Sequence, residues 1–211
     1  MNSRKLSIIT GISYLIIFFA AVFANFVMLE SLKQNPLETI RLDHMSVRFG
    51  ILAFLITVLF DVVVAWGLFG LYRKHKFTRL STYFRLMHAA IMGVAVFALV
   101  LTLKLDSADE ILYQVDVFEI IWLIGLFFFG AHLILLSNII QKPKWIAAFL
   151  FIAGIMYMVD TTAHFLLPDY ADFAGIFLAM VAVPSILGEM AFTVWLLVKG
   201  GKDKEKEIEK D

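Results

Sequence analysis

Long, continuous runs of apolar residues dominate the chain, and short polar segments separate them. A helix that crosses a bilayer takes about 20 residues, and six runs reach that length. They cover residues 7–29, 50–72, 83–103, 118–140, 145–167 and 173–198. None of them alternates polar and apolar residues over about ten positions, as the strand of a membrane β-barrel does. The pattern therefore predicts an all-α protein, with six transmembrane helices forming one bundle over residues 1–200.

The composition supports a membrane protein and excludes several other classes. Hydrophobic residues make up 61% of the 211 residues, whereas soluble domains are about 45–50% apolar. Eighteen basic residues balance eighteen acidic ones, so no excess positive charge is available for nucleic-acid phosphates. The absence of cysteine excludes disulfides, thiolate catalysis and iron–sulfur clusters. We therefore expect the lipid bilayer as a partner and no nucleic acid, and a homo-oligomer or a membrane partner subunit stays open.

The positions of the basic residues predict an orientation. If the N-terminus is cytoplasmic, fourteen of the eighteen Lys and Arg residues lie on the cytoplasmic side, together with a charged, solvated tail over residues 201–211. The exceptions are Lys33, Arg41, Arg48 and Lys104. Because basic residues gather on the cytoplasmic side of a membrane, both termini are predicted to be cytoplasmic. The first run imitates a signal peptide but is longer than a usual signal core, so we expect it to be retained.

Ionisable residues inside the apolar runs form a candidate site, which we call the inner polar layer. Each such residue costs roughly 2.5–3.5 kcal/mol on insertion scales. With a rise of about 1.5 Å per residue from the cytoplasmic ends, His88 lies about 8 Å deep, His132 about 12 Å, Glu189 about 14 Å and Asp61 about 16 Å. Arg85 lies one turn closer to the cytoplasm than His88. Four helices thus place an acid or an imidazole at similar depth, which predicts a ligand or proton site.

This inner polar layer allows four interpretations. In a structural network, Arg85 pairs with Asp61 or Glu189 and the histidines bond to carbonyls, because buried polar groups need partners. In a ligand-binding or proton-coupled transport site, the acids and imidazoles exchange protons near neutral pH. Zinc or iron held by His88, His132, Asp61 and Glu189, or a b-type haem between two histidines, would make it a cofactor site. No HExxH pattern supports the metal.

A second candidate, the outer polar group, lies in the fifth run. Asp160 and His164 are four residues apart, so their side chains are expected to meet on one face of a helix. Tyr157 extends the same face. We interpret the group as a hydrogen-bonded pair near the outer surface. The alternative is an intramembrane metal-dependent hydrolase site, for which two ligands at positions i and i+4 are suitable.

Several short segments occur along the chain in a distinctive order. They are Phe49-Gly50, Leu59-Phe60-Asp61, Tyr83-Phe84-Arg85-Leu86, Phe128-Phe129-Gly130 with His132, Ala153-Gly154 with Tyr157 and Asp160, Leu166-Leu167-Pro168, Gly188-Glu189 and Trp195-Leu196-Leu197-Val198-Lys199-Gly200. In these segments the chain resembles an uncharacterised bacterial integral membrane family, domain of unknown function 4386. One departure is Lys142-Pro143-Lys144-Trp145, where the family usually has a longer, glycine-containing segment. The resemblance implies six helices in a bacterial cytoplasmic membrane, and it implies no substrate or reaction.

These observations lead to one expectation for function and two alternatives. We expect a multi-pass protein of the bacterial cytoplasmic (inner) membrane, of a binding or transport type rather than an enzyme. Its inner polar layer would handle a small molecule or protons. The alternatives are an intramembrane metal-dependent enzyme and an accessory membrane subunit without a site of its own.

Overall fold

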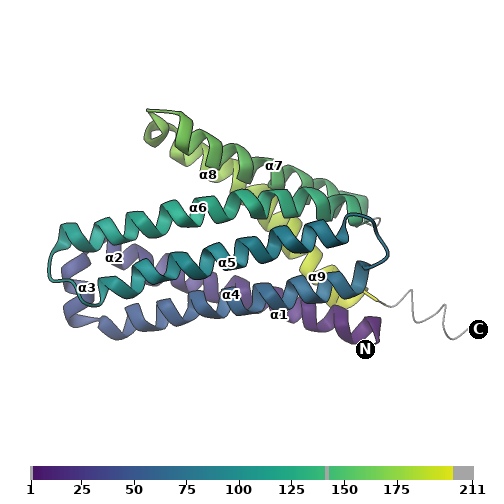
Figure 1. Ribbon diagram of the computed structural model, residues 1–211, viewed down its shortest axis with the longest axis horizontal. Helices are drawn as coiled ribbons and strands as arrows, with labels where there is room; N and C mark the ends of the chain where they lie inside the picture. The colour runs from purple at the N-terminus through teal and green to yellow at the C-terminus, as the bar shows by residue number, and fades with distance from the viewer. Residues whose placement is uncertain (1, 141–142, 202–211) are drawn as a thin grey trace, which may run out of the picture.

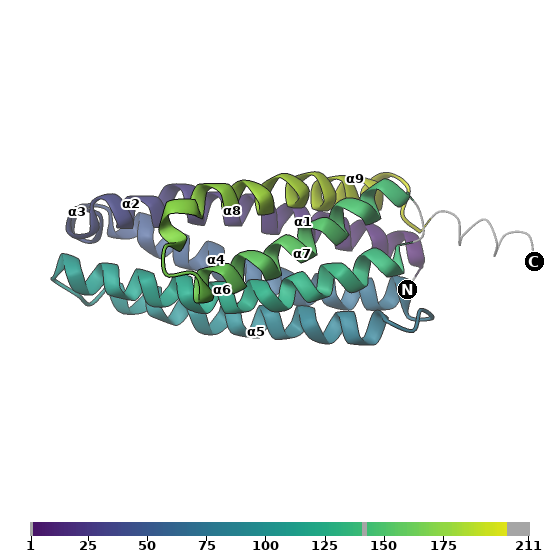
Figure 2. The ribbon, with the colours of Figure 1, turned by 90° about the horizontal axis from the view of Figure 1, so that it is seen from above.

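The computed structural model describes residues 2–140 and 143–201, and all of its regular elements in these ranges are helices. The long helices form an elongated bundle with the N-terminus and the end of the last helix at the same end (Figures 1 and 2), which we call the terminal end. Six helical spans are long and apolar enough to cross a membrane. The predicted all-α, six-helix membrane architecture is therefore confirmed. Of the predicted charged tail, residues 202–211 lie outside the described residues.

The first and last spans each contain a π-helical stretch, whereas the four middle spans are single α-helices. The first span consists of α1 (Ser3–Phe23), a π-helical stretch (Ala24–Leu29) and α2 (Glu30–Gln34). A short helix follows it, α3 (Pro36–Leu42). The middle spans are α4 (His44–Tyr72), α5 (Thr78–Thr102), α6 (Ala108–Ile139) and α7 (Lys144–Leu166). The last span consists of α8 (Tyr170–Ser185), a second π-helical stretch (Ile186–Met190) and α9 (Ala191–Val198).

Every span begins before the apolar run that predicted it. The largest difference is in α6, which starts at Ala108 and not at residue 118. Its first turn carries Asp109 and Glu110, which interact favourably with the positive end of the helix dipole. An apolar run reports only the part of a helix that matches the hydrocarbon, and the backbone hydrogen bonds continue into the polar residues before it.

Consecutive spans pack against each other around the bundle. Contacts join α1 to α4, α4 to α5, α5 to α6, α6 to α7 and α7 to α8, and α9 returns to α1. Gly130 of α6 and Gly154 of α7 approach so closely that a Cβ on either would lie 2.6 Å from the carbonyl oxygen of the other. Small residues permit this approach between membrane helices. Away from the terminal end, α8 and the adjoining part of α7 diverge from the other helices (Figure 1).

Arg4 ties the first span to the last at the terminal end. Its guanidinium donates to the main-chain carbonyls of Leu196 at 3.0 Å and Gly200 at 2.9 Å, and also to that of Leu197. The hydroxyl of Ser7 donates to the Leu196 carbonyl as well, at 2.9 Å. The last carbonyls of a helix lack partners within the helix, and a cation there also interacts favourably with the helix dipole. These bonds hold α1 against α9.

Two apolar clusters fill the bundle, and the inner polar layer lies between them. The cluster toward the opposite end includes Phe54 and Phe118. The cluster toward the terminal end includes Val64 and Leu133. On α4, Asp61 lies between Phe54 of the first cluster and Val64 of the second. The polar side chains of the layer are thus enclosed by packed apolar residues, where each buried donor and acceptor needs a partner within the protein.

Candidate functional site

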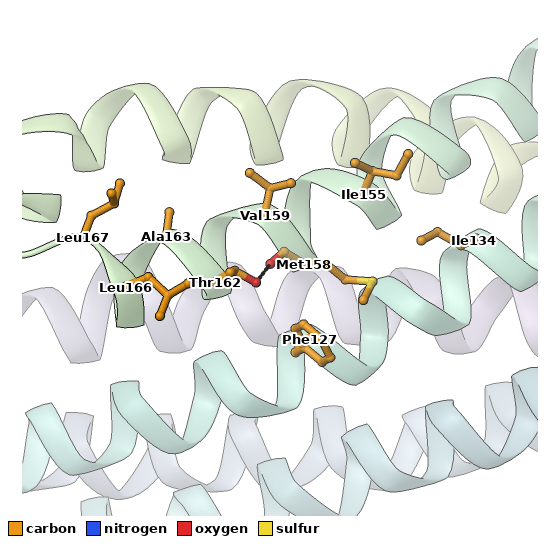
Figure 3. A pocket seen from close by; sticks show the side chains of 9 residues that line it. All are labelled: Phe127, Ile134, Ile155, Met158, Val159, Thr162, Ala163, Leu166 and Leu167. Carbon is orange, nitrogen blue, oxygen red and sulfur yellow. Dashed lines mark hydrogen bonds between the residues drawn. The ribbon is translucent and has the colours of Figure 1, made fainter.

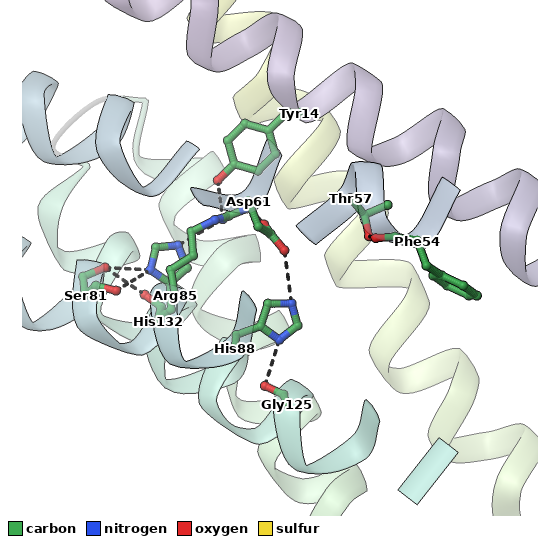
Figure 4. Close-up of polar contacts among 9 residues, drawn as sticks. All are labelled: Tyr14, Phe54, Thr57, Asp61, Ser81, Arg85, His88, Gly125 and His132. Atoms are coloured by element: carbon green, nitrogen blue, oxygen red, sulfur yellow. Dashed lines mark hydrogen bonds and ion pairs between the residues drawn. The ribbon is translucent and has the colours of Figure 1, made fainter. Parts of the chain in front are cut away.

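A buried ion pair between Asp61 of α4 and Arg85 of α5 is the centre of the inner polar layer (Figure 4). The Nη2 atom of Arg85 donates to Oδ1 of Asp61 at 2.5 Å. The side chains are 1% exposed for Arg85 and 8% for Asp61. Removing two charges from water costs several kcal/mol per ion, and close pairing with further hydrogen bonds offsets that cost. The partners of both side chains therefore determine whether the layer is stable.

His88 connects Asp61 to α6. Its Nε2 atom lies 3.4 Å from Oδ2 of Asp61, and its Nδ1 atom lies 3.0 Å from the carbonyl oxygen of Gly125. A carbonyl only accepts, so Nδ1 carries the proton of the neutral ring. A second proton on Nε2 would turn the contact with Asp61 into a charge-assisted hydrogen bond. The protonation state of His88 therefore changes how strongly it holds Asp61.

His132 of α6 is held as a neutral ring with one defined tautomer. Its Nε2 atom lies 3.3 Å from Nη1 of Arg85. Because arginine only donates, Nε2 must accept, and the ring proton must be on Nδ1. That nitrogen lies 3.0 Å from the carbonyl oxygen of Ser81 and 2.9 Å from its hydroxyl. The same Nη1 atom also donates to the hydroxyl of Tyr14 at 2.9 Å.

Phe129 fills the space between the charged and imidazole groups. The guanidinium carbon of Arg85 lies 5.3 Å from the centre of the Phe129 ring and 4.8 Å from that of Tyr14. Ring centres of His88 and His132 lie 4.9 Å and 5.8 Å from that of Phe129. A cation over an aromatic face gains electrostatic stabilisation that increases when water is absent. Aromatic faces therefore stabilise Arg85 where hydrogen bonds do not reach it.

Glu189 lies beside this network without joining its hydrogen bonds. It is half-buried on the second π-helical stretch, after Pro184 of α8. Its carboxylate interacts electrostatically with Arg85, Asp61 and Tyr14. It has no hydrogen bond or ion pair to any side chain within residues 2–140 and 143–201. Arg85 correspondingly keeps one buried donor, Nε, without a described partner. Direct contacts thus join four of the five predicted residues, and the fifth is close to them.

Two members of the network were missed by the sequence analysis, Tyr14 and Ser81. Each lies on a helix face that the spacing of polar residues in the sequence indicates. Ser81 precedes Arg85 by four residues, and Tyr14 follows Ser7 and Thr10 at helical spacing. Hydroxyl groups inside apolar runs are weak signals, because they can bond to their own helix. Thr10 does so, donating to the carbonyl four residues before it.

The geometry of the layer does not fit the metal or haem alternatives. Asp61 and His132 both contact the guanidinium of Arg85, so a metal cation between them would meet a fixed positive charge. Both ring nitrogens of each histidine already have partners, which leaves neither free for haem iron. In the described part of the chain, no three His, Asp or Glu side chains are placed so that they can hold a metal ion.

The outer polar group is organised differently from the prediction. Asp160 accepts a hydrogen bond of 2.6 Å from the hydroxyl of Tyr170, and the ring of His164 lies 4.6 Å from the Tyr170 ring. The described contacts of Asp160 and His164 do not include a hydrogen bond between the two. Tyr157 packs instead against Phe129 of the inner network, with ring centres 5.5 Å apart. The expected Asp160–His164 pair is therefore replaced by contacts to the first residue of α8.

A small cavity extends from His132 toward the terminal end. It has a volume of about 10 Å³, and Ser81, Thr78, Thr82 and Tyr72 are among the residues that line it. A cavity of about 10–15 Å³ with polar partners has room for one water molecule. The inner polar layer thus adjoins a cavity with polar lining residues toward the terminal end, while Phe54 and Phe118 pack on its opposite side.

Removing one partner of the central ion pair is expected to destabilise the fold strongly. The variant Asp61→Leu leaves the buried guanidinium of Arg85 without its counter-ion, at a cost of about 3–5 kcal/mol. The double variant Asp61→Leu/Arg85→Leu removes both charges, and it is expected to recover most of that loss. Unfolding of the purified variants in detergent mixtures measures both effects. Independent, additive losses in the single variants would contradict the pairing.

Comparisons with known proteins place the chain in a family without a described activity. A protein of Archaeoglobus fulgidus (strain ATCC 49558 / DSM 4304 / JCM 9628 / NBRC 100126 / VC-16), described as an uncharacterized protein, is 29% identical to the chain over 163 residues, which cover 74% of this chain and 87% of that protein. No solved structure matches. Residues 9–200 match the family described as "Domain of unknown function (DUF4386)". The resemblance seen in the sequence is thus confirmed, and the chain belongs to the DUF4386 family.

Proposed function

We propose that this membrane protein is of a binding or transport type and that its inner polar layer binds and releases protons. One observation carries the proposal: the carboxylate of Glu189 lies within electrostatic range of the buried Asp61–Arg85 ion pair but is not paired with it. With both acids ionised, these three groups carry a net negative charge, and one bound proton makes them neutral. The hydrocarbon region disfavours uncompensated charge. Binding of one proton therefore lowers the electrostatic energy of these three groups.

The surroundings of the layer favour access from the terminal end. A series of polar groups extends in that direction, from His132 through Ser81 to the small cavity lined by Thr78 and Thr82. Toward the opposite end, Phe54 and Phe118 pack with ring centres 5.0 Å apart. Chains of acids, imidazoles and hydroxyls are the usual components of intramembrane proton relays. This arrangement supports a proton site that is reached from one side of the membrane.

Protons fit the layer better than a small organic molecule does. The cavity beside His132 has a volume of about 10 Å³, whereas pockets for small molecules measure about 300–1,000 Å³. His88 extends the polar network, because its Nε2 atom faces Asp61 at 3.4 Å. A purely structural network is the competing interpretation, and it predicts no titration of the layer.

A protonated carboxyl group is expected to be detectable at Glu189. We expect the pH-difference infrared spectrum of the reconstituted protein to contain the C=O band of a protonated carboxyl group, and Glu189→Gln to remove it. The matched control is Glu38→Gln, which alters an exposed acid of α3 and is expected to leave the band unchanged. A spectrum without such a band, or one in which Glu189→Gln changes nothing, refutes the proposal.

We further propose that the protein resides in the bacterial cytoplasmic membrane with both termini in the cytoplasm. The terminal end holds Arg4, the basic loop between α4 and α5, Lys144 and Lys199. At the opposite end, Lys33 is neutralised by an ion pair with Glu119. Because basic residues accumulate on the cytoplasmic side, this distribution supports the orientation.

The orientation can be measured with single cysteines, because the chain contains none of its own. Lys74→Cys places a thiol in the loop between α4 and α5, and Asp106→Cys places one in the loop between α5 and α6; both positions are exposed. In intact cells, a membrane-impermeant maleimide is expected to label Asp106→Cys and to label Lys74→Cys only after the membrane is permeabilised. The reverse pattern contradicts the orientation.

A further inference from the structure

A groove on the outside of the bundle separates the start of α7 from the second π-helical stretch and α9. It has a volume of about 830 Å³, within the range of ligand pockets. Along most of its length its walls are apolar, formed by residues such as Leu187, Met190 and Val194. Val194 is 54% exposed and Leu187 is 47% exposed. The groove therefore faces the hydrocarbon of the bilayer.

One end of the groove has a different chemistry. Trp145, Trp195 and Lys199 line it there, and the exposed Lys144 adjoins Trp145. These residues belong to the first turn of α7 and the end of α9, so they lie at the terminal end of the bundle. Indole rings favour the level of the lipid headgroups, and lysines there attract anionic headgroups. No acidic residue lines the groove within the described part of the chain.

We propose that this groove binds one anionic phospholipid from the leaflet at the terminal end. An acyl chain lies along the apolar walls, and the phosphate lies near Lys199 and Lys144. Lipid chains are already in an apolar solvent, so the walls alone give little preference for an occupant. The charge at the mouth supplies the selectivity, with about a fivefold preference per lysine.

A second groove lacks lysines like those at the end of the first groove, and it shows why those charges are needed for lipid selectivity. It lies between α6 and α7 and has a volume of about 530 Å³ (Figure 3). Its only polar lining side chain among the described residues is Thr162, whose hydroxyl donates to the carbonyl of Met158 in its own helix at 2.7 Å. Nothing in its lining distinguishes one lipid from another, so no selective occupant is assigned to it.

Tryptophan quenching tests the proposal directly. Trp145 and Trp195 line the groove, and Trp66→Phe/Trp122→Phe removes the two other tryptophans. This background protein is reconstituted in phosphatidylcholine with a small fraction of either brominated phosphatidylglycerol or brominated phosphatidylcholine. We expect the anionic lipid to quench more strongly, with an enrichment of about fivefold or more. Lys144→Gln/Lys199→Gln is expected to abolish the difference.

Two further variants separate the groove from other effects. Lys74→Gln removes a charge from the same end of the bundle in the loop after α4, outside the groove, and it is expected to retain the preference. Val194→Phe fills the groove without changing charge, and it is expected to weaken quenching by phosphatidylglycerol. Equal quenching by the two lipids overturns the proposal, as does an equal loss in Lys74→Gln. Protection of both tryptophans from either lipid also overturns it, because a second copy then covers the groove.

Discussion

The buried guanidinium of Arg85 determines how the neighbouring helices are arranged. Arginine remains charged and has no acceptor atom. Each neighbouring group must therefore accept a hydrogen bond, through an oxygen or an unprotonated ring nitrogen, or present an aromatic face to the cation. Asp61 of α4, Tyr14 of α1 and His132 of α6 meet that requirement. The contact with Arg85 also fixes the tautomer of His132 and directs its proton toward Ser81. A single charge thus organises three helices around α5.

In our proposal, the same network combines a structural role with the capacity to bind a proton. His132 is fully bonded and neutral, as a structural residue is. Glu189 is different, because it shares the field of Arg85 without a bond to it. It also lies on a π-helical stretch, and such stretches often occur at functional sites. A network that served packing alone would need one acid for its one cation, and here a second acid lies beside the ion pair.

The sequence was most informative where the membrane imposes a cost. The six spans could be predicted because the length of an apolar run matches the thickness of the hydrocarbon. Charged and imidazole groups inside those runs must face the interior of the bundle, which made it possible to group Asp61, Arg85, His88 and His132. The start of α6 was missed, since its first turns lie outside the hydrocarbon.

Contacts that depend on a second helix were not predictable from the sequence. Tyr14 carries no charge that marks its position, and its partner Arg85 is on a different span. The i, i+4 rule considers one helix only, so it paired Asp160 with His164 and could not include Tyr170 of the next helix. The unpaired state of Glu189 likewise depends on how α8 and α9 pack against the other spans.

We propose that Glu189, the unpaired carboxylate near Arg85, exchanges a proton. The most direct test is solid-state NMR of the reconstituted protein with labelled glutamate carboxyl carbons, recorded over the pH range in which the protein remains folded. We expect the Glu189 signal, assigned by its absence in Glu189→Gln, to change between the carboxylate and carboxylic acid positions within that range. A Glu189 carboxyl that stays ionised throughout would show that this residue does not exchange a proton.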